Sequence, residues 1–451
     1  MSTQPPGPRG LPVIGNTRQY ARDPFSFITA CAEAYGDVAR FQLGPMETYM
    51  LADPDDIERV LVTEEERFRK PRFQDEALAE LLGNGLLLSE GDEWRRQRDL
   101  AQPAFHMQRL AGLAGTMTDY TEAMAGGWAD GDAVDVGIEM ARLTVKIIVD
   151  AMLGTELTDE RVRLVQENLE PLGARFEPDP IRFLVPEWAP TRENRDYRTA
   201  IETLEGVIDE IVEERRGTET EEGRTETGKT DLLSLLLRAQ ARGEQTDEQI
   251  RDEVMTMLLA GHDTTALTLT YAWYLLSQHP ETEARVHREL NEVLGGDAPT
   301  MADLRRLRYT ERVLLETMRL YPPVYVMFRQ PKVDVKLGGY RVPAGAAVML
   351  PQWAVHRSPR YYDDPEAFDP DRWTPERRSA RPRFSYFPFG GGSRHCIGKQ
   401  FSMMEAKLIL GTVAQRFELD YAGEPPIELR GSLTMHPREP VTMTLRARRA
   451  D

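Results

Sequence analysis

The chain has 451 residues, of which 74 are acidic and 56 are basic, and its formal net charge is −18. This acidic balance argues against nucleic acid as a partner, and no segment approaches the ~20 apolar residues that a membrane span requires. The length exceeds that of a typical domain, yet no linker rich in Pro, Gly or Ser divides the chain, so we expect one domain over residues 1–451.

The first fifty residues predict a helix and a hairpin. Cys31 lies in a helical stretch, where a buried thiol is expected, and residues 39–43 alternate apolar and polar side chains before a Gly-Pro turn. The only other cysteine is Cys396. Two such cysteines form no disulfide framework, which suits a reducing cytoplasm.

Helical patterns dominate the next part of the chain. Trp94 and Arg98 are four residues apart, so they share one helix face, and both carry N–H donors suited to a carboxylate. The alternative for Arg98 is a solvated surface charge. We predict two further helices, at 141–153 and 200–216. Residues 218–230 are rich in Glu, Thr and Gly and predict an exposed, mobile loop.

A long helix is predicted from Thr246 to His279. Thr246 and Gln249 form a capping box, and Pro280 ends the helical pattern. At ~1.5 Å per residue this helix is roughly 50 Å long.

The block Ala-Gly-His-Asp-Thr-Thr stands in the middle of this helix. Ala260 and Thr264 share a face, and we expect Gly261 to leave room for a ligand there. A mid-helix threonine can bond to the carbonyl one turn earlier and open a site for water, so Asp263 and Thr264 form a candidate acid–alcohol proton relay. The alternative is a helix N-cap or a satisfied core threonine. We expect His262 to point elsewhere, as a core or solvated histidine.

The next segments supply a helix and a second hairpin. On the helix predicted at 309–320, Glu316 and Arg319 share a face and can pair. Residues 333–337 alternate before Gly338-Gly339, which predicts a hairpin. Because strand signals are few and short, the fold class expected is mainly α with small β-sheets (α+β).

Residues 389–398 read Phe-Gly-Gly-Gly-Ser-Arg-His-Cys-Ile-Gly and carry the strongest chemical signal. A cysteine thiolate donates electrons to iron and favours cleavage of bound dioxygen. Glycines let the backbone turn tightly beneath a flat macrocycle, and amide N–H groups at a helix N-terminus can stabilise the thiolate. The alternative is a Gly-rich turn before a helix with a buried cysteine.

This loop resembles the haem-ligand signature of the cytochrome P450 superfamily. The resemblance implies a haem b held between the long helix and the helix after the loop, with Cys396 as the axial ligand of the iron. It also implies that Asp263 and Thr264 relay protons to dioxygen. The signature positions are Phe389, Gly392, Arg394, Cys396 and Gly398.

The resemblance extends to other segments. Residues 365–373 resemble the family's meander, whose arginine, here Arg372, would complete a structural cluster with Glu316 and Arg319. Phe389 would shield the sulfur from water, and Ala260 would face the haem. The side chains that would contact the haem propionates are Trp94, Arg98, Arg329 and Arg394.

The implied activity is that of a haem-thiolate monooxygenase, which inserts one oxygen atom of O2 into a C–H or C=C bond. Pocket positions of the family are mostly apolar here, so the substrate expected is lipophilic: a fatty acid, terpenoid, carotenoid or steroid-like molecule. Two alternatives remain, a haem-thiolate peroxygenase or isomerase and a non-catalytic haem sensor or carrier. The pocket segments are 73–88, 172–184, 255–259, 324–328 and 433–435.

Electrons are expected from a separate ferredoxin with its reductase, because no Gly-rich dinucleotide fingerprint follows a strand and no room remains for a fused reductase. A basic run before the loop is the expected dock, with a merely solvated run as the alternative. Its residues are Arg377, Arg378, Arg381 and Arg383, with Arg95, Arg96, Lys399 and Lys407 expected on the same face.

A soluble, cytoplasmic monomer is expected. The proline-rich start resembles the hinge of membrane-anchored relatives, but only residues 1–4 precede it. The acidic surface would also fit a salt-rich host, with GC-rich coding as the alternative reason for arginine over lysine.

Overall fold

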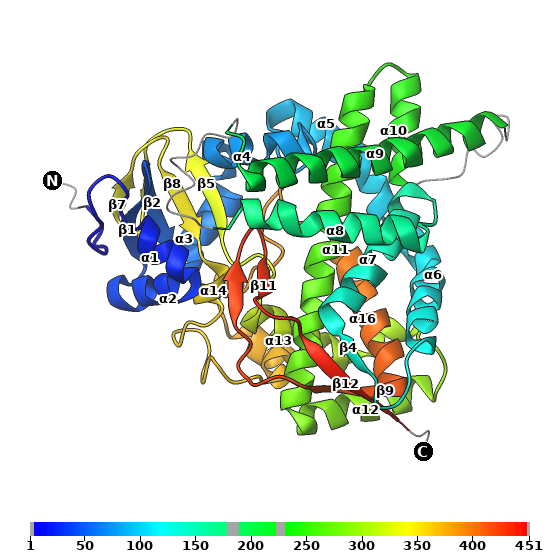
Figure 1. Cartoon of the computed structure of the whole chain (residues 1–451). Helices are drawn as coiled ribbons and strands as arrows, with labels where there is room; N and C mark the ends of the chain where they lie inside the picture. Colours follow the sequence, from blue (N-terminus) through cyan, green and yellow to red (C-terminus); the bar gives the residue numbers. More distant parts are fainter. Residues whose placement is uncertain (1–3, 178–188, 222–230, 449–451) are drawn as a thin grey trace.

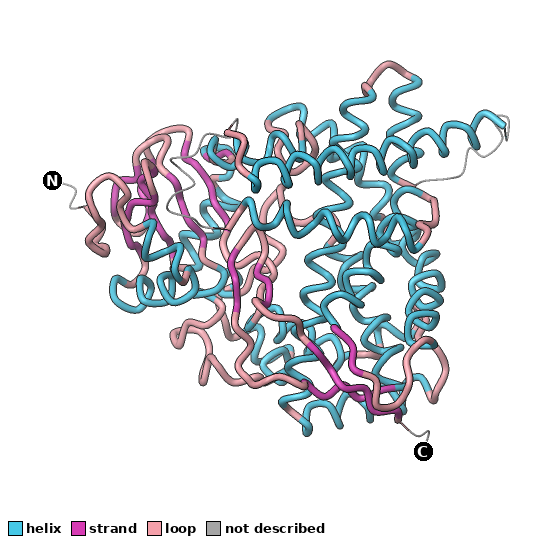
Figure 2. The backbone as a smooth tube through the Cα atoms, viewed as in Figure 1, coloured by secondary structure: helices cyan, strands magenta, loops and turns pink. Residues whose placement is uncertain are grey.

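The computed structural model of the chain describes residues 4–177, 189–221 and 231–448. Helices make up most of it, and within these ranges the strands form four small sheets (Figures 1 and 2). The longer helices are α2 (Pro24–Tyr35), α4 (Arg72–Leu82), α5 (Gly91–Ala101), α6 (Met107–Gly126), α7 (Val136–Leu153), α8 (Asp159–Arg175), α9 (Arg192–Glu221), α10 (Leu232–Ala241), α11 (Asp247–Gln278), α12 (Pro280–Leu294), α13 (Arg308–Leu320) and α16 (Lys399–Arg416).

Short helical turns complete the helical part. They are α1 (Thr17–Arg22), α3 (Pro54–Glu58), α14 (Gln352–Val355), α15 (Pro375–Ser379), the π-turn η1 (Arg59–Thr63), and the 3₁₀ turns η2 (Glu65–Arg67), η3 (Gln102–Phe105), η5 (Asp303–Arg305), η6 (Pro370–Trp373) and η7 (Arg383–Ser385).

The largest sheet has five strands in the order β1-β2-β8-β5-β3 and lies beside α1 and α2 at the N-terminal side of the molecule (Figure 1). β2 and β8 are parallel, and the other pairs are antiparallel. The strands are β1 (Val38–Leu43), β2 (Met46–Leu51), β3 (Phe68–Arg69), β5 (Met327–Pro331) and β8 (Ala347–Leu350).

Three smaller antiparallel sheets remain, in the orders β4-β12-β9, β6-β7 and β10-β11. The third is a hairpin beside α11, and α11 runs through the helical part (Figure 1). The strands are β4 (Ala133–Asp135), β6 (Val335–Leu337), β7 (Tyr340–Val342), β9 (Phe417–Tyr421), β10 (Leu429–Gly431), β11 (Met435–Pro437) and β12 (Thr442–Ala447).

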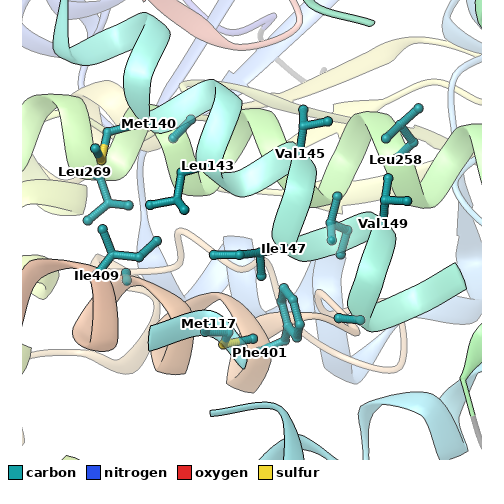
Figure 3. Packing of buried hydrophobic residues seen from close by; sticks show 14 of the residues in the cluster. Met117, Met140, Leu143, Val145, Ile147, Val149, Leu258, Leu269, Phe401 and Ile409 are labelled. Atoms are coloured by element: carbon teal, nitrogen blue, oxygen red, sulfur yellow. The ribbon is translucent and has the colours of Figure 1, made fainter. Parts of the chain in front are cut away.

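The main core lies where α7 crosses α11 and α16. Figure 3 shows Leu143 and Ile147 of α7 packed among Leu269 of α11 and Ile409 and Phe401 of α16. All five side chains are at least 95% buried. At roughly 1.5–3 kcal/mol for each buried large apolar side chain, this crossing fixes α11 and α16 relative to one another. Of these two helices, α11 carries Thr264 and α16 follows Cys396.

Most predicted elements are confirmed. The capping box at Thr246 is present at the start of α11, and Pro280 begins the next helix. Both hairpins form, β1-β2 and β6-β7, although Val333 lies outside the second one and is 50% exposed. Cys31 is buried in α2, and burial raises the pKa of its thiol to about 12.

The predicted boundary between the helix at 200–216 and the loop at 218–230 was wrong. The backbone stays helical to Glu221, one turn into the segment predicted as a mobile loop, because extending an existing helix needs no new nucleus. The rest of that prediction, residues 222–230, lies outside the described residues. Within the described ranges, none of the helices has both the length and the apolar character that crossing a membrane requires.

Candidate active site

The loop before α16 is closed by its own backbone. The amide of Cys396 donates to the carbonyl of Phe389 at 3.0 Å, and Gly390 and Gly392 have φ of +68° and +69°. A Cβ on Gly392 would lie 1.9 Å from the carbonyl oxygen of Leu61. A side chain at position 392 would therefore force the loop away from η1, and only glycine fits.

The sulfur of Cys396 lies at the N-terminus of α16. Burial raises the pKa of this thiol, while amide donors from Gly398 and Lys399 and the positive charges of Arg98 and Lys399 act in the opposite direction. A Cβ added to Gly398 would be only 3.9 Å from the sulfur. The residue nevertheless remains accessible. Amide donors on one side and an open approach on the other fit a thiolate that ligates a metal.

The middle of α11 offers an accessible Ala260 while Met257 and Leu258, just before it, are buried. The hydroxyl of Thr264 donates to the carbonyl of Ala260 at 3.2 Å, as predicted for a threonine that loosens the helix there. The expectation for Gly261 was wrong. Its missing Cβ would lie 2.7 Å from the side chain of Ile148, so this glycine allows α7 to pack closely and does not make room for a ligand.

Asp263 points away from its predicted partner. Within the described part of the chain, its carboxylate makes no hydrogen bond to Thr264. It accepts from the hydroxyl of Thr434 at 2.7 Å and lies 3.5 Å from Nε2 of His436. His262 is a buried core histidine, which was one of the two predicted alternatives. Its Nδ1 lies 2.6 Å from the carbonyl oxygen of Leu258.

Burial alone would raise the pKa of Asp263. The charge and hydrogen bond of His436, followed by His262 and Thr434, outweigh burial and hold this pKa well below its ordinary value. Asp263 is therefore an ionised carboxylate at neutral pH.

Arg329 and Arg394 meet at a cavity of about 220 Å³ that Trp94 also lines. The guanidinium of Arg394 stacks 4.5 Å from the Trp94 ring and pairs with Glu90 at 3.0 Å. Burial, helped by the charge of Arg394, lowers the pKa of Arg329 to about 10. Two guanidinium groups that repel each other at one cavity fit an anionic group, such as a propionate.

Arg98 behaves differently from Trp94, although they share a face of α5. Its guanidinium donates to the carbonyl of His395 at 2.9 Å and thereby braces the cysteine loop. Phe389 is partly buried, and the ammonium of Lys399 lies 5.6 Å from its ring.

The predicted cluster around Glu316 is present. Arg319 binds its carboxylate through two N–H groups at 2.8 and 2.9 Å, and Arg372 reaches it at 3.2 Å. Trp373 adds an indole donor at 2.9 Å. Arg319 also donates to the carbonyls of His356, Pro365 and Ala367, so the cluster ties α13 to the segment before the cysteine loop.

Two members of the predicted basic face lie elsewhere. Arg381 donates to the carbonyl of Arg372 and stacks 5.0 Å from Trp373, because its flat guanidinium gains more from the aromatic surface than from water. Lys407 is only 7% exposed and pairs with Glu311. The other six are exposed: Arg95, Arg96, Arg377, Arg378, Arg383 and Lys399.

The contacts of Thr434 and His436 with Asp263 were missed at the sequence level. The two residues are two apart near a short strand, so they share a face, and Thr434 lies in the expected pocket segment 433–435. Nothing local connects them with Asp263, which lies 171 residues from Thr434.

The sequence profile of the family described as "Cytochrome P450" matches residues 5–444. The chain belongs to the cytochrome P450 family. This P450 is 38% identical to cyclooctatin synthase of Streptomyces melanosporofaciens over 418 residues, which cover 91% of this chain and 89% of the relative. It is 35% identical to cyclooctat-9-en-7-ol 5-monooxygenase of the same organism, with 91% and 88% covered.

Pentalenene oxygenase of Streptomyces avermitilis is 33% identical, with 96% of this chain and 95% of the relative covered. A crystal structure of the cytochrome P450DA heme domain superposes with a TM-score of 0.87 at 29% identity, covering 100% of this chain and 99% of that one. The P450 is thus an oxidoreductase of the monooxygenase type, and its family binds haem through a cysteine thiolate.

Proposed function

We propose that this P450 binds haem b through Cys396 and uses O2 to oxygenate a terpenoid hydrocarbon or alcohol. The observation that carries the substrate class is the 38% identity with cyclooctatin synthase along 91% of the chain. The names of two other relatives, pentalenene oxygenase and cyclooctat-9-en-7-ol 5-monooxygenase, refer to an unsaturated hydrocarbon and an unsaturated alcohol.

The side chains have distinct roles in this proposal. Haem, when bound, supplies the activation of dioxygen. Burial raises the pKa of Cys396, the amides of Gly398 and Lys399 oppose this shift in favour of the thiolate, and Arg329 and Arg394 would bind the propionates beside Trp94. Arg98 acts indirectly, because it holds the carbonyl of His395 in the cysteine loop.

The residue proposed to deliver protons, Thr264, lies on α11. Oxygenation converts substrate, O2, two electrons and two protons into the hydroxylated product and water, so a sheltered site needs a proton relay. The Thr264 hydroxyl donates to the carbonyl of Ala260, which is exposed on this helix. We expect Thr264→Ala to bind haem normally, consume electrons and release peroxide in place of product. A haem sensor or carrier would show no turnover in the parent protein.

The substrate class is tested by titrating the purified ferric protein with terpenes, fatty acids, carotenoids and steroids while following the Soret band. Several residues of the expected pocket segments are large and apolar, which favours a lipophilic ligand; residues 178–184 of these segments lie outside the described residues. A shift toward high spin with terpenoids supports the proposal. A shift with fatty acids or steroids alone contradicts it.

We further propose that a ferredoxin docks at the exposed members of the basic face. Burial lowers the pKa of Lys399, and the nearby charges of Arg378 and Arg383 lower it further, which indicates a concentrated positive patch beside Cys396. The double variant Arg378→Glu/Arg383→Glu should slow ferredoxin-driven turnover at least ~10-fold, which corresponds to about 1.4 kcal/mol of binding free energy lost to the ferredoxin. Peroxide-driven turnover should stay unchanged. Arg288→Glu, an exposed position on α12, is the matched control. Equal losses in both assays would contradict docking there.

A further inference from the structure

The turn η2 presents one carboxylate to the cysteine loop. Oε2 of Glu65 accepts a hydrogen bond from the amide of Ser393 at 3.0 Å and another from the hydroxyl of the same residue at 3.1 Å. A Cβ added to Gly392 would lie 2.5 Å from this oxygen, so the contact is close along the backbone as well. Hydrogen bonds to a carboxylate are stronger than those to a neutral acceptor. Glu65 therefore holds the turn that precedes Cys396 by three residues.

The ion pairs of a neighbouring residue keep η2 in place. The carboxylate of Glu64 pairs with Arg59 on one side and with Arg67 on the other, both at 2.7 Å. Arg67 also donates to the carbonyl of Asp334 at 3.1 Å, and its own carbonyl accepts from the amide of Lys332 at 2.8 Å. These contacts anchor η2 to the segment between β5 and β6 without help from the cysteine loop.

A second side chain holds the loop from a different element and with the opposite chemistry. Arg98 of α5 donates to the carbonyl of His395 at 2.9 Å, whereas Glu65 of η2 accepts from Ser393. The loop is thus fastened at positions 393 and 395, just before the residue that carries the sulfur. Because both anchors belong to elements outside the loop, each one limits how far the loop can move.

Glu65 also acts through its charge. It lines the cavity at Arg329, where burial and the charge of Arg394 lower the pKa of Arg329 while the charges of Glu90 and Glu65 oppose them. The charge and the hydrogen bonds of Glu65 are separable, because glutamine keeps an acceptor oxygen and loses the charge, whereas alanine loses both.

We propose that Glu65 is a positioning residue for Cys396, which holds the amide and hydroxyl of Ser393 and so keeps the loop in the conformation that presents the sulfur to the haem iron. This inference rests on the proposed ligation of haem by Cys396. Without Glu65, the turn at Ser393 loses its contact with η2 and only the anchor at Arg98 remains. The sulfur is then held less firmly, and haem is retained less well.

The first test measures hydrogen exchange in the haem-loaded, full-length protein. Glu65→Ala should speed exchange of the amides at 390–396 at least ~10-fold, because it removes hydrogen bonds to a charged group. Glu65→Gln should restore most of the protection. Glu66→Ala, which removes the neighbouring exposed carboxylate, is the matched control and should exchange like the parent. Unchanged exchange in Glu65→Ala would overturn the proposal.

The second test measures haem ligation by two readouts. The ferrous–carbonyl spectrum gives the fraction of haem with a thiolate ligand, and transfer to a haem acceptor protein gives the dissociation rate. Glu65→Ala should lower the first and raise the second several-fold, and Glu65→Gln should stay close to the parent. Ser393→Ala keeps the amide donor and should have a smaller effect, with no further effect in the Glu65→Ala background.

Two outcomes of this second test would contradict the inference. If Glu65→Ala lowers only the free energy of unfolding and leaves both readouts unchanged, Glu65 is merely structural. If Glu65→Gln behaves like Glu65→Ala, the charge matters and the contact with the loop does not. A parent protein without a thiolate spectrum would instead refute the proposed ligation by Cys396, while hydrogen exchange still decides whether Glu65 holds the loop.

Discussion

Two carboxylates of this P450 are held by clusters of opposite character. Glu316 is fully buried and is bound by two arginines and an indole, whereas Asp263 is about a quarter exposed and is bound by a threonine and a histidine. The closed cluster is sealed from water, whereas water reaches the side chains of the open cluster.

Removing one partner from the closed cluster should have the largest effect. Arg319→Met leaves Glu316 buried beside a single remaining arginine and should lower the free energy of unfolding by about 3–5 kcal/mol. Chemical denaturation measures this, and haem retention should fall with it. The matched control Arg285→Met removes a half-exposed ion pair with Asp371 and should lower the free energy of unfolding by only about 0–1 kcal/mol. Similar losses in both variants would contradict the distinction.

A third carboxylate, Glu253, sharpens the comparison because it is buried with fewer partners. It accepts from the amide of Leu86 at 3.1 Å, and among the described residues its other oxygen has no hydrogen-bond partner. Burial raises its pKa from 4.5 to about 7. Between these two values the folded protein keeps a proton that the unfolded chain has lost, so stability falls as the pH rises through this window.

Glu253→Gln removes that ionisation. At pH 8 the variant should therefore be more stable than the parent by up to about 3 kcal/mol, and at pH 4 the difference should vanish. Thermal or urea unfolding at the two pH values measures it. Glu292→Gln, at an exposed position of α12, should show no such pH-dependent difference. A constant difference at both pH values would mean that folding does not raise the pKa of Glu253.

The smallest effect is expected where the open cluster meets α8. Arg430 and Glu177 are both about one-third exposed. Arg430→Gln should therefore lower the free energy of unfolding by less than about 1 kcal/mol. This loss should shrink at 1 M KCl, because salt screens exposed charges. Denaturation at low and high KCl measures it. A loss of several kcal/mol that is insensitive to salt would place this pair with the closed cluster.

Local chemistry explains what could be predicted. The capping box of α11, the two hairpins, the Glu316–Arg319 pair and the cysteine loop depend on residues within a few positions of one another, so their patterns are visible in the chain. The inward direction of Arg381 and the packing of Gly261 on Ile148 depend on surfaces that only the fold assembles. Asp263 illustrates the limit best, because its relay with Thr264 stays a prediction and its side-chain partners come from a hairpin that is distant in the sequence.

The position of that hairpin has a consequence during synthesis. Thr434 is made 171 residues after Asp263, which at about 5–20 residues per second means a delay of roughly 10–30 s. Throughout this interval Asp263 has been made but its partner Thr434 has not. The cluster around Asp263 is therefore completed from the C-terminal end of the chain, and translation has to be nearly finished before Thr434 can bind this carboxylate.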